Sequence, residues 1–514
     1  MNHHISLLSL LAGALGASVS ASAADRPNVL FLAVDDWNDW TGPMGNSQAK
    51  TPNLDRLAGR GVTFTNAHCP GVYCAPSRTA IMTGIHPYTS GSYADQTHMF
   101  NHPEYVGIQS WFSENGYGVY GTGKLYHHMP GYLDLRGWDE FFVRDEQQKR
   151  DGWPMGSWDY GAPLPEKWPV SKLYDPTKEY KKPPSHLEYG ALPNAAEDAM
   201  ADTIRADWAC KFLKQPHDEP FFLAVGLYAP HRQNYVPRKY FDLYPLHSVQ
   251  LPVCKEGDLD DLPESVRRPK LNRKKVIHDR LMELDEAKPT LRGYLAALSY
   301  ADTMLGRVLD ALDENGHADN TIVVLWSDNG YHHGEKTHWG KHTMWERTTN
   351  VPFMWAGPGL ARGAKIDATV SLIDTYPTLL ELCGLPPNDQ VEGVSLASVL
   401  RKPQDATDRS VVVSGAEGMH FAVVNQSWRY IRYGDGEEEL YDLTKDPNEW
   451  SNLAADEDAY AEVRQTMAAH LPDHPAKPGL GKKSRTAKLV IQGEDFRWVA
   501  VDAKSDKKGN NYRE

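Results

Sequence analysis

Four polar residues stand directly after short apolar runs that are typical of buried β-strands. Asp35 and Asp36 follow the run NVLFLAV, and Asp328 and Asn329 follow the run IVVLW with one serine between. Carboxylate and amide oxygens are the ligands that hard divalent cations prefer, so these residues predict a site for Ca²⁺ or Mg²⁺ rather than for Zn²⁺. The sequence has no HExxH motif and no CxxC pair, which argues against zinc.

Two further segments deliver ionisable side chains in the same way. Lys124 and His127 follow the run GVYG, and His231 follows the run FFLAVGL. Any one of these residues could equally cap a helix or form a turn. Because ligands bind beyond the carboxyl ends of the strands in open α/β sheets, four such segments together predict one ligand-binding edge.

Cys74 stands at the start of a short helical pattern that Gly84 is expected to end. Pro76 suits the first turn of that helix, and the amides of a helix N-terminus favour an anion. From these residues alone, Cys74 is either an activated thiolate nucleophile or one half of a disulfide with Cys69. The local pattern leaves both alternatives open.

Alternating strand and helix patterns predict the fold that must position these groups. We expect an α/β protein with a large, mostly parallel sheet flanked by helices, and a smaller C-terminal α+β subdomain built on an antiparallel sheet. Leucines spaced by three and four residues from Leu295 to Leu312 predict a long helix that Gly316 ends. Five continuous apolar runs predict buried parallel strands at residues 28–34, 118–121, 221–227, 322–326 and 352–355.

The composition is that of a soluble globular protein. The chain has 514 residues, of which 24% are charged, and its net charge of −14 argues against nucleic-acid binding. Residues 1–23 resemble a signal peptide, with an apolar stretch and then small residues, so we expect a periplasmic or secreted protein. No later apolar run is long enough for a transmembrane helix. We expect a catalytic domain over residues 24–400 and a C-terminal subdomain and tail over 401–514.

A specific motif surrounds Cys74, and with it the sequence resembles the type I sulfatases of the alkaline phosphatase superfamily. The motif is Cys-x-Pro-Ser-Arg followed by x-x-x-x-Thr-Gly, formed here by Cys74, Pro76, Ser77, Arg78, Thr83 and Gly84. The resemblance extends from about residue 27 to residue 453 through PNVLFLAVDD, GTGKLYH, SDNG and YDLTKDPNEWSNL. PFFLAVGLYAPH at 220–231 and the helical segment at 293–312 are most similar to the iduronate-2-sulfatase-like branch.

The resemblance implies that a maturation enzyme oxidises Cys74 to formylglycine, whose hydrate supplies the nucleophilic oxygen. It also implies a Ca²⁺ site, with Mg²⁺ less favoured, formed by Asp35, Asp36, Asp328, Asn329 and the modified Cys74. The remaining roles fall on basic residues: Arg78 would orient the hydrate, and Lys124 and Lys341 would hold the sulfate oxygens. His231 would protonate the leaving alcohol. His127 would be the later base, with the neighbouring His128 as a rival.

Two positions depart from the closer branch. Asn329 stands where that branch usually has His, and His338 replaces an acidic residue, so iduronate itself is not implied as the substrate. His338 is expected either to contact the substrate or to be a partly solvated loop residue. His332 and His333 are expected to be loop residues rather than ligands.

The expected function is therefore an exported sulfatase that acts on a sulfated glycan, such as ulvan, carrageenan or glycosaminoglycan fragments. The alternatives are a formylglycine-type phosphonate or phosphate ester hydrolase, and a catalytically dead protein that binds sulfated glycans. Every expected catalytic position is filled, which argues against a dead site. If Cys74 is modified, four cysteines remain, and the sequence leaves their pairing open: Cys69, Cys210, Cys254 and Cys383.

Overall fold

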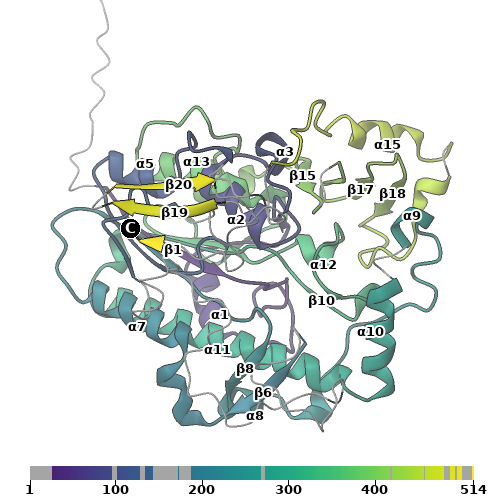
Figure 1. Ribbon diagram of the computed structural model, residues 1–514, viewed down its shortest axis with the longest axis horizontal. Coiled ribbons are helices and arrows are strands. Elements are labelled where there is room, and N and C mark those ends of the chain that lie inside the picture. Colours follow the sequence, from purple (N-terminus) through teal and green to yellow (C-terminus); the bar gives the residue numbers. More distant parts are fainter. Residues whose placement is uncertain are drawn as a thin grey trace, which may run out of the picture.

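Strand β1, Asn28–Val34, lies inside an eight-stranded sheet in this computed structural model (Figure 1). The strand order is β13-β2-β12-β9-β1-β7-β4-β5. β1 pairs in parallel with β7 (Phe221–Gly226) and β9 (Thr321–Ser327), and β4 (Gly118–Gly123) pairs in parallel with β7. Because helices cover both faces of these strands, their apolar runs are continuous. The predicted α/β fold with a mostly parallel sheet is confirmed.

The structure describes residues 26–94, 96, 101–127, 134–142, 172, 187–267, 272–416, 419–456 and 458–479, and the strand segments 487–492, 495–500 and 512–513. The predicted signal peptide over residues 1–23 lies outside this part of the chain. Among the described residues, none of the helices combines the length and the apolar character needed to cross a membrane.

One predicted strand runs in the opposite direction to our expectation. β12, Phe353–Ala356, pairs antiparallel with both β9 and β2 (Val62–Phe64). Parallel neighbours need a long crossover, usually a helix packed on the sheet. Between β9 and β12 the chain has the short strands β10 (His332–His333) and β11 (Trp339–Gly340), one 3₁₀ turn and the single-turn helix α12 (Glu346–Thr349). None of these is a crossover helix packed on the sheet, and β12 runs opposite to β9. A continuous apolar run carries no information about strand direction.

Helices cover both faces of the sheet, and the side chains of β1 alternate between two hydrophobic cores. The even-numbered residues of β1 pack with three helices on one face: α1 (Pro52–Gly59), α7 (Ala201–Leu213) and α11 (Ala287–Glu314). The odd-numbered residues pack with three on the other: α2 (Cys74–Thr83), α5 (Ile108–Glu114) and α13 (Thr375–Leu382). α11 is the helix predicted from the leucine spacing, and it ends before Gly316.

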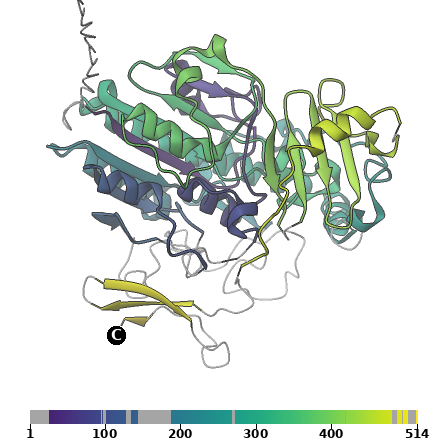
Figure 2. The ribbon, with the colours of Figure 1, turned by 90° about the horizontal axis from the view of Figure 1, so that it is seen from above.

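A second, antiparallel sheet forms the C-terminal subdomain, as predicted. Its strands are β15 (Val411–Ser414), β16 (Phe421–Val424), β17 (Trp428–Arg432) and β18 (Glu438–Asp442), in that order. Helix α15, Ala461–Ala468, contacts β16 and β17. Figure 2 shows this unit in yellow-green beside one end of the large sheet.

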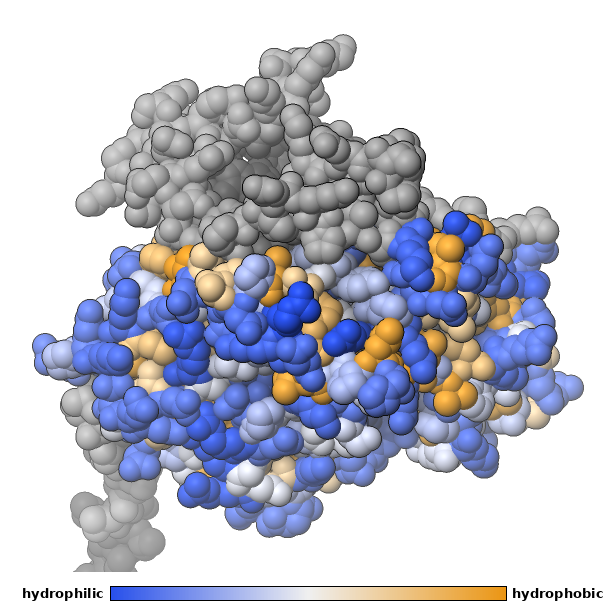
Figure 3. All heavy atoms as spheres, turned by 90° about the horizontal axis from the view of Figure 1, so that it is seen from below, coloured by the Kyte–Doolittle hydropathy of each residue, from blue (hydrophilic) through white to orange (hydrophobic). Residues whose placement is uncertain are grey.

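The shorter elements include the two edge strands of the large sheet, β13 and β5, and small strands and helices outside it. They include β3 (Ala67–His68), β5 (Glu140–Phe142), β6 (Tyr189–Leu192), β8 (Asn234–Pro237), α8 (Arg238–Asp242), α10 (Asn272–Glu283), β10 (His332–His333), β11 (Trp339–Gly340), β13 (Ala364–Ile366), β14 (Val370–Ser371) and α14 (Ala397–Arg401). The face on the side of α8 and α11 is mainly hydrophilic, with small, separate apolar areas (Figure 3). Isolated apolar areas of this kind are normal on a folded protein.

Candidate active site

Four neighbouring strands deliver the predicted site residues to one edge of the sheet. β9, β1, β7 and β4 are adjacent. Their carboxyl ends lead into Asp328 and Asn329, Asp35 and Asp36, His231, and Lys124 with His127, in that order. The structure thus brings together segments that are up to about 290 residues apart in the chain; for example, the amide of Asp36 donates to Asp328 Oδ1 at 3.2 Å.

Cys74 is the first residue of α2 and is buried among the charged groups of this edge. Its thiol donates to Asp35 Oδ1 at 3.2 Å. The ammonium of Lys341 lies 2.9 Å from Cys74 Sγ, and that of Lys124 lies 3.7 Å from it. Residue 74 therefore lies between two cations and a carboxylate at the N-terminus of a helix, where an anionic ligand is favoured.

The structure contradicts one of the two local interpretations of Cys74 and argues against the other. All five cysteines are free, so the disulfide with Cys69 is wrong. Burial raises the pKa of the Cys74 thiol well above its usual range, and the carboxylates of Asp328 and Asp35 raise it further. An activated thiolate needs a lowered pKa. The unmodified thiol is therefore a poor nucleophile in this position.

The carboxylates around Cys74 suit a hard cation. Ligand atoms of Asp35, Asp36, Cys74 and Asp328 all lie within 4.8 Å of one another. Asn329 donates from Nδ2 to Asp36 Oδ1 at 2.8 Å. Its buried Oδ1 accepts no hydrogen bond within the described part of the chain. A buried carbonyl oxygen without a partner beside three carboxylates is the arrangement expected of a Ca²⁺ or Mg²⁺ ligand set.

Arg78 connects the carboxyl ends of three strands of the large sheet. Its fully buried guanidinium donates from Nε to Asp328 Oδ2 at 2.7 Å, from Nη2 to the carbonyl of Val34 at 3.0 Å, and also to the carbonyl of Lys124. The carboxylates of Asp328 and Asp35 outweigh burial and raise the pKa of Arg78. Arg78 thus links the ends of β1, β4 and β9 through charge-assisted hydrogen bonds.

The three carboxylates of the site differ in their tendency to ionise. Burial favours the neutral form of Asp35, but Lys124, His231 and Arg78 outweigh it and hold its pKa well below the usual value. Burial raises the pKa of Asp36, and it raises that of Asp328 to about 6. A crowded set of buried carboxylates favours a proton or a metal ion.

The charges of the site are balanced before any ion binds. Three carboxylates, those of Asp35, Asp36 and Asp328, face three permanent cations, which are Arg78, Lys124 and Lys341. A bound divalent cation would make the pocket positive and therefore selective for an anionic ligand. The net charge of −14 for the whole chain is no guide to this pocket.

The two predicted catalytic histidines lie at the site in different surroundings. His231 Nδ1 donates to the carbonyl of Arg232 at 2.5 Å, and His231 Nε2 lies 3.7 Å from Asp36 Oδ2. The bond at Nδ1 leaves Nε2 as the nitrogen that exchanges its proton. His127 is buried, and its ring centre lies 6.2 Å from that of Tyr73, the residue before Cys74. His128 is not among the described residues.

The segment that carries Lys341 is a buried hairpin rather than a solvated loop. His332 and His333 form β10 and are buried, so the prediction that they are loop residues is wrong. The prediction that His338 is partly solvated is also wrong, because its Nε2 donates to the carbonyl of Lys341 at 3.1 Å from a buried position. Packing against other segments buries these three histidines, and the sequence of the hairpin alone does not reveal that burial. Contact between His338 and substrate stays a prediction.

The sequence did not reveal how the C-terminal subdomain supports this hairpin. Arg429 of β17 is fully buried; it donates to the carbonyl of Met344 at 2.9 Å and pairs with Glu346 and Glu449. Lys336 is also buried and lies 3.1 Å from Asp258 Oδ1. These ion pairs fix the chain on both sides of Lys341. The only sequence feature that pointed to these ion pairs was the segment 441–453 of the family resemblance, which contains Glu449.

This network predicts a pH dependence of stability. Burial raises the pKa of Glu449 from 4.5 to about 7, although Arg429 opposes the shift. A carboxyl group whose pKa is raised in the folded state stabilises that state fully at pH values below its pKa in the unfolded state. This stabilisation is lost as the pH rises through about 7. Between pH 5 and pH 8, Glu449→Gln should therefore lose less unfolding free energy than the wild type, by about 1 kcal/mol or more. Urea unfolding at both pH values measures this, and the exposed Glu437→Gln should behave like the wild type. Equal losses in wild type and Glu449→Gln would contradict the assignment.

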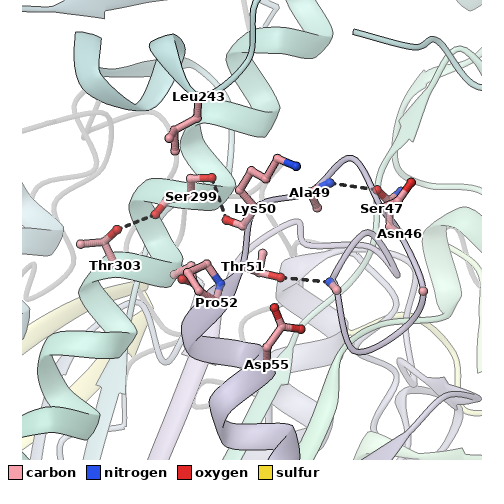
Figure 4. Close-up of a pocket in the computed structure, with 13 residues that line it drawn as sticks. Asn46, Ser47, Ala49, Lys50, Thr51, Pro52, Asp55, Leu243, Ser299 and Thr303 are labelled. Carbon is pink, nitrogen blue, oxygen red and sulfur yellow. Dashed lines mark hydrogen bonds between the residues drawn. The ribbon is translucent and has the colours of Figure 1, made fainter. Parts of the chain in front are cut away.

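A separate pocket lies away from these groups. It has a volume of about 720 Å³, and Figure 4 shows it between the loop that carries Lys50 and the α11 residues Ser299 and Thr303. The exposed Leu243 and the carboxylate of Asp55 also line it. None of the predicted catalytic or metal-binding residues lines this pocket. The chemistry therefore belongs to the sheet edge.

Comparison with known proteins identifies the family to which this chain belongs. The sulfatase family pattern matches residues 27–385, and the pattern described as N-sulphoglucosamine sulphohydrolase, C-terminal, matches residues 334–477. The chain belongs to the sulfatase family, so it is a sulfuric ester hydrolase. It is 39% identical to a sulfatase of Formosa agariphila over 84% of this chain and 83% of that protein. It is 30% identical to human iduronate 2-sulfatase over 77% and 72% of the two chains.

Solved structures share the fold at lower sequence identity. A structure solved in complex with D-glucosamine-2-N,6-O-disulfate has a TM-score of 0.66 and 21% identity, and covers 86% of this chain and 96% of its own. A phosphonate monoester hydrolase from Silicibacter pomeroyi has a TM-score of 0.69 and 18% identity, over 94% and 100% of the two chains. The same architecture thus occurs in proteins named for sulfur and for phosphorus esters.

Proposed function

We propose that this protein is an exported, Ca²⁺-dependent sulfatase that hydrolyses sulfate monoesters of a sulfated glycan after Cys74 has been oxidised to formylglycine. The observation that carries the proposal is the position of Cys74. Its Sγ lies 3.2 Å from Asp35 Oδ1 and 2.9 Å from Lys341 Nζ, yet the pKa of the thiol is raised. Cys74 lies at the centre of the charged groups but is a poor nucleophile as a thiol. This combination supports its oxidation to formylglycine before catalysis.

A sulfated glycan fits both the relatives and the charge of the site. The similarity to iduronate 2-sulfatase supports a sulfated sugar as the substrate. Ulvan, carrageenan and glycosaminoglycan fragments all carry sulfate monoesters. The motif at the N-terminus, residues 1–23, supports export to the periplasm or the medium, where such polysaccharides occur. Cell fractionation tests the export: a protein retained in the cytoplasm with an intact N-terminus would contradict it.

The divalent cation would be held by Asp35, Asp36, Asp328, Asn329 and residue 74. When bound, it supplies charge neutralisation and orientation for the sulfate oxygens. Lys124, which follows β4, and Lys341, which follows β11, flank residue 74, and both ammonium groups would donate to the same sulfate. Preorganised cations of this kind act on the charge that develops in the transition state.

The first chemical step uses residue 74 and His231. With formylglycine at position 74, one hydroxyl of its hydrate would give its proton to Asp35, whose Oδ1 lies 3.2 Å from Cys74 Sγ, and its oxygen would attack sulfur while the bond between sulfur and the sugar oxygen breaks. His231 gives the proton on Nε2 to the leaving sugar alkoxide, a contribution typically worth about 10²–10⁴-fold. Oδ2 of Asp36 lies 3.7 Å from this nitrogen, so a protonated imidazole would have a carboxylate beside it.

The second step regenerates the aldehyde. His127 removes the proton from the remaining hydroxyl of residue 74, the carbon–oxygen bond to sulfate breaks, and sulfate leaves. Water then restores the hydrate. An alcohol such as serine has no second hydroxyl and cannot release sulfate in this way.

Substrate comparison tests the proposal against the phosphorus alternative. Purified protein is assayed with 4-nitrophenyl sulfate and with 4-nitrophenyl phenylphosphonate, with and without a Ca²⁺ chelator. We expect the higher kcat/KM for the sulfate ester and a loss of activity on chelation that added Ca²⁺ restores. A higher kcat/KM for the phosphonate ester, or full activity in chelator, would contradict the proposal.

A further inference from the structure

Arg232, the residue directly after His231, carries a guanidinium that the proposed mechanism does not use. It is 2% exposed. Its Nη2 donates to Nδ1 of His333 at 3.0 Å. The guanidinium carbon lies 4.7 Å from the ring centre of Tyr331 and 5.7 Å from that of Trp339. Arg232 is thus enclosed by aromatic rings instead of by carboxylates.

The remaining nitrogens of this guanidinium lack partners. Nε and Nη1 of Arg232 are buried and make no hydrogen bond to any residue that the structure describes. Asp36 is the acidic group whose charge acts on Arg232, but Lys341 and Asn329 already bind that carboxylate. Arginine stays protonated even where burial lowers its pKa, as it does here. A buried charge without a partner is costly.

The other large, fully buried arginines show how unusual this is. Arg78 pairs with Asp328 at 2.7 Å, Arg205 pairs with Asp202 at 2.7 Å, and Arg429 pairs with Glu346 and Glu449. In each of these cases the protein supplies the oxyanion. For Arg232 none of the described residues supplies an oxyanion, and an anionic group of a bound molecule would provide the balancing charge.

The position of Arg232 indicates which molecule that is. Its backbone carbonyl accepts the Nδ1 hydrogen bond of His231, the residue that protonates the leaving sugar. Tyr331, which stacks on the guanidinium, is two residues beyond Asn329 of the cation site. Arg232 therefore belongs to the wall of the active site on the side of His231, where the sugar is expected to lie.

We propose that Arg232 binds a second oxyanion of the substrate, a carboxylate or a further sulfate, on the sugar that carries the scissile sulfate or on its neighbour. The inference rests on the proposed function and narrows it to glycans with more than one anionic group per repeat. Arginine suits this role because its planar donor set matches carboxylate and sulfate oxygens. The aromatic rings keep water away and so strengthen the interaction.

Matched substrates test this inference. Wild type, Arg232→Met and Arg232→Lys are assayed on three sugar sulfates: a uronic acid 2-sulfate, the same sugar with its carboxyl group reduced to an alcohol, and a disulfated hexosamine. Each rate is divided by that variant's rate on 4-nitrophenyl sulfate. We expect wild type to prefer a substrate with a second anion, and Arg232→Met to lose about 30-fold or more of that preference, mainly in KM. If the preference is lost on the uronic acid 2-sulfate, the anion is a carboxylate. If it is lost on the disulfated hexosamine, the anion is a sulfate.

Controls separate binding from folding. Arg292 also stacks on a ring, that of Phe241, at 5.6 Å, but it lies on α11 outside the site, so Arg292→Met should keep the wild-type preference. Arg232→Lys keeps the charge and tests the inference if the Met variant does not fold. Equal losses on all substrates, or a wild type without preference for a second anion, would overturn the inference. A wild type inactive on every sulfate would instead refute the proposed function.

Discussion

Cys74→Ser is expected to abolish turnover, with kcat on 4-nitrophenyl sulfate reduced by about 10⁴-fold or more. The serine hydroxyl is close in size to the thiol, and residue 74 makes its contacts to Asp35, Lys124 and Lys341 through one side-chain atom. The variant should therefore fold and bind substrate. It cannot become an aldehyde, so any sulfated serine that forms has no route to release sulfate. Steady-state and single-turnover assays on the same preparation measure the loss.

Cys69→Ser provides a matched control for this prediction. Cys69 is a buried, free thiol five residues earlier in the chain, and its hydrogen bond goes to the carbonyl of Thr348, not to a site residue. This variant should keep its activity, with at most a loss of stability. Normal turnover by Cys74→Ser would refute the mechanism, because a serine would then perform every step assigned to formylglycine.

Asp328→Ala is expected to cost both activity and stability. Asp328 is fully buried and accepts hydrogen bonds from Arg78 Nε at 2.7 Å and from the amides of Asp36 and Asn329. Its removal leaves the buried guanidinium of Arg78 without its closest carboxylate, which typically costs about 3–5 kcal/mol. It also removes one proposed ligand of the cation. Ca²⁺ should therefore raise the unfolding temperature of the wild type, as any ligand of the native state does, but not that of the variant.

The ion pair between Asp39 and Arg347 supplies the comparison for this effect. Asp39 lies in the loop after β1 and Arg347 lies in α12, and both side chains are about one quarter exposed. Asp39→Ala should cost only about 1 kcal/mol and keep the response to Ca²⁺. If Asp328→Ala retained a Ca²⁺-dependent rise in unfolding temperature, the assignment of the cation site would be wrong.

Much of the site could be predicted from the sequence because its polar residues come directly after the apolar runs that form the strands. Asp35, Lys124, His231 and Asp328 each come shortly after a buried apolar run, and parallel strands bring such residues to one edge. The helix that starts at Cys74 was also predictable, since Pro76 and Gly84 mark its two ends. These signals are local and need no knowledge of distant contacts.

The features that escaped prediction depend on contacts between distant segments. β12 runs antiparallel to β9, and its continuous apolar residues do not encode that direction. His332 and His338 are buried because they pack against the segment that carries Lys341. Arg232 has no carboxylate partner among the described residues, and this becomes visible only when the partners of the buried arginines are compared. A charged residue in a sequence does not show whether the fold supplies its counter-charge.

The identity of residue 74 in the active enzyme tests the central claim most directly. The protein is purified from a host with a maturation enzyme, and the peptide that contains residue 74 is analysed by mass spectrometry with an aldehyde-specific label. We predict formylglycine at position 74, in a fraction that rises in proportion to kcat across preparations of different maturation. Full activity in a preparation whose residue 74 is entirely unmodified cysteine would contradict the account.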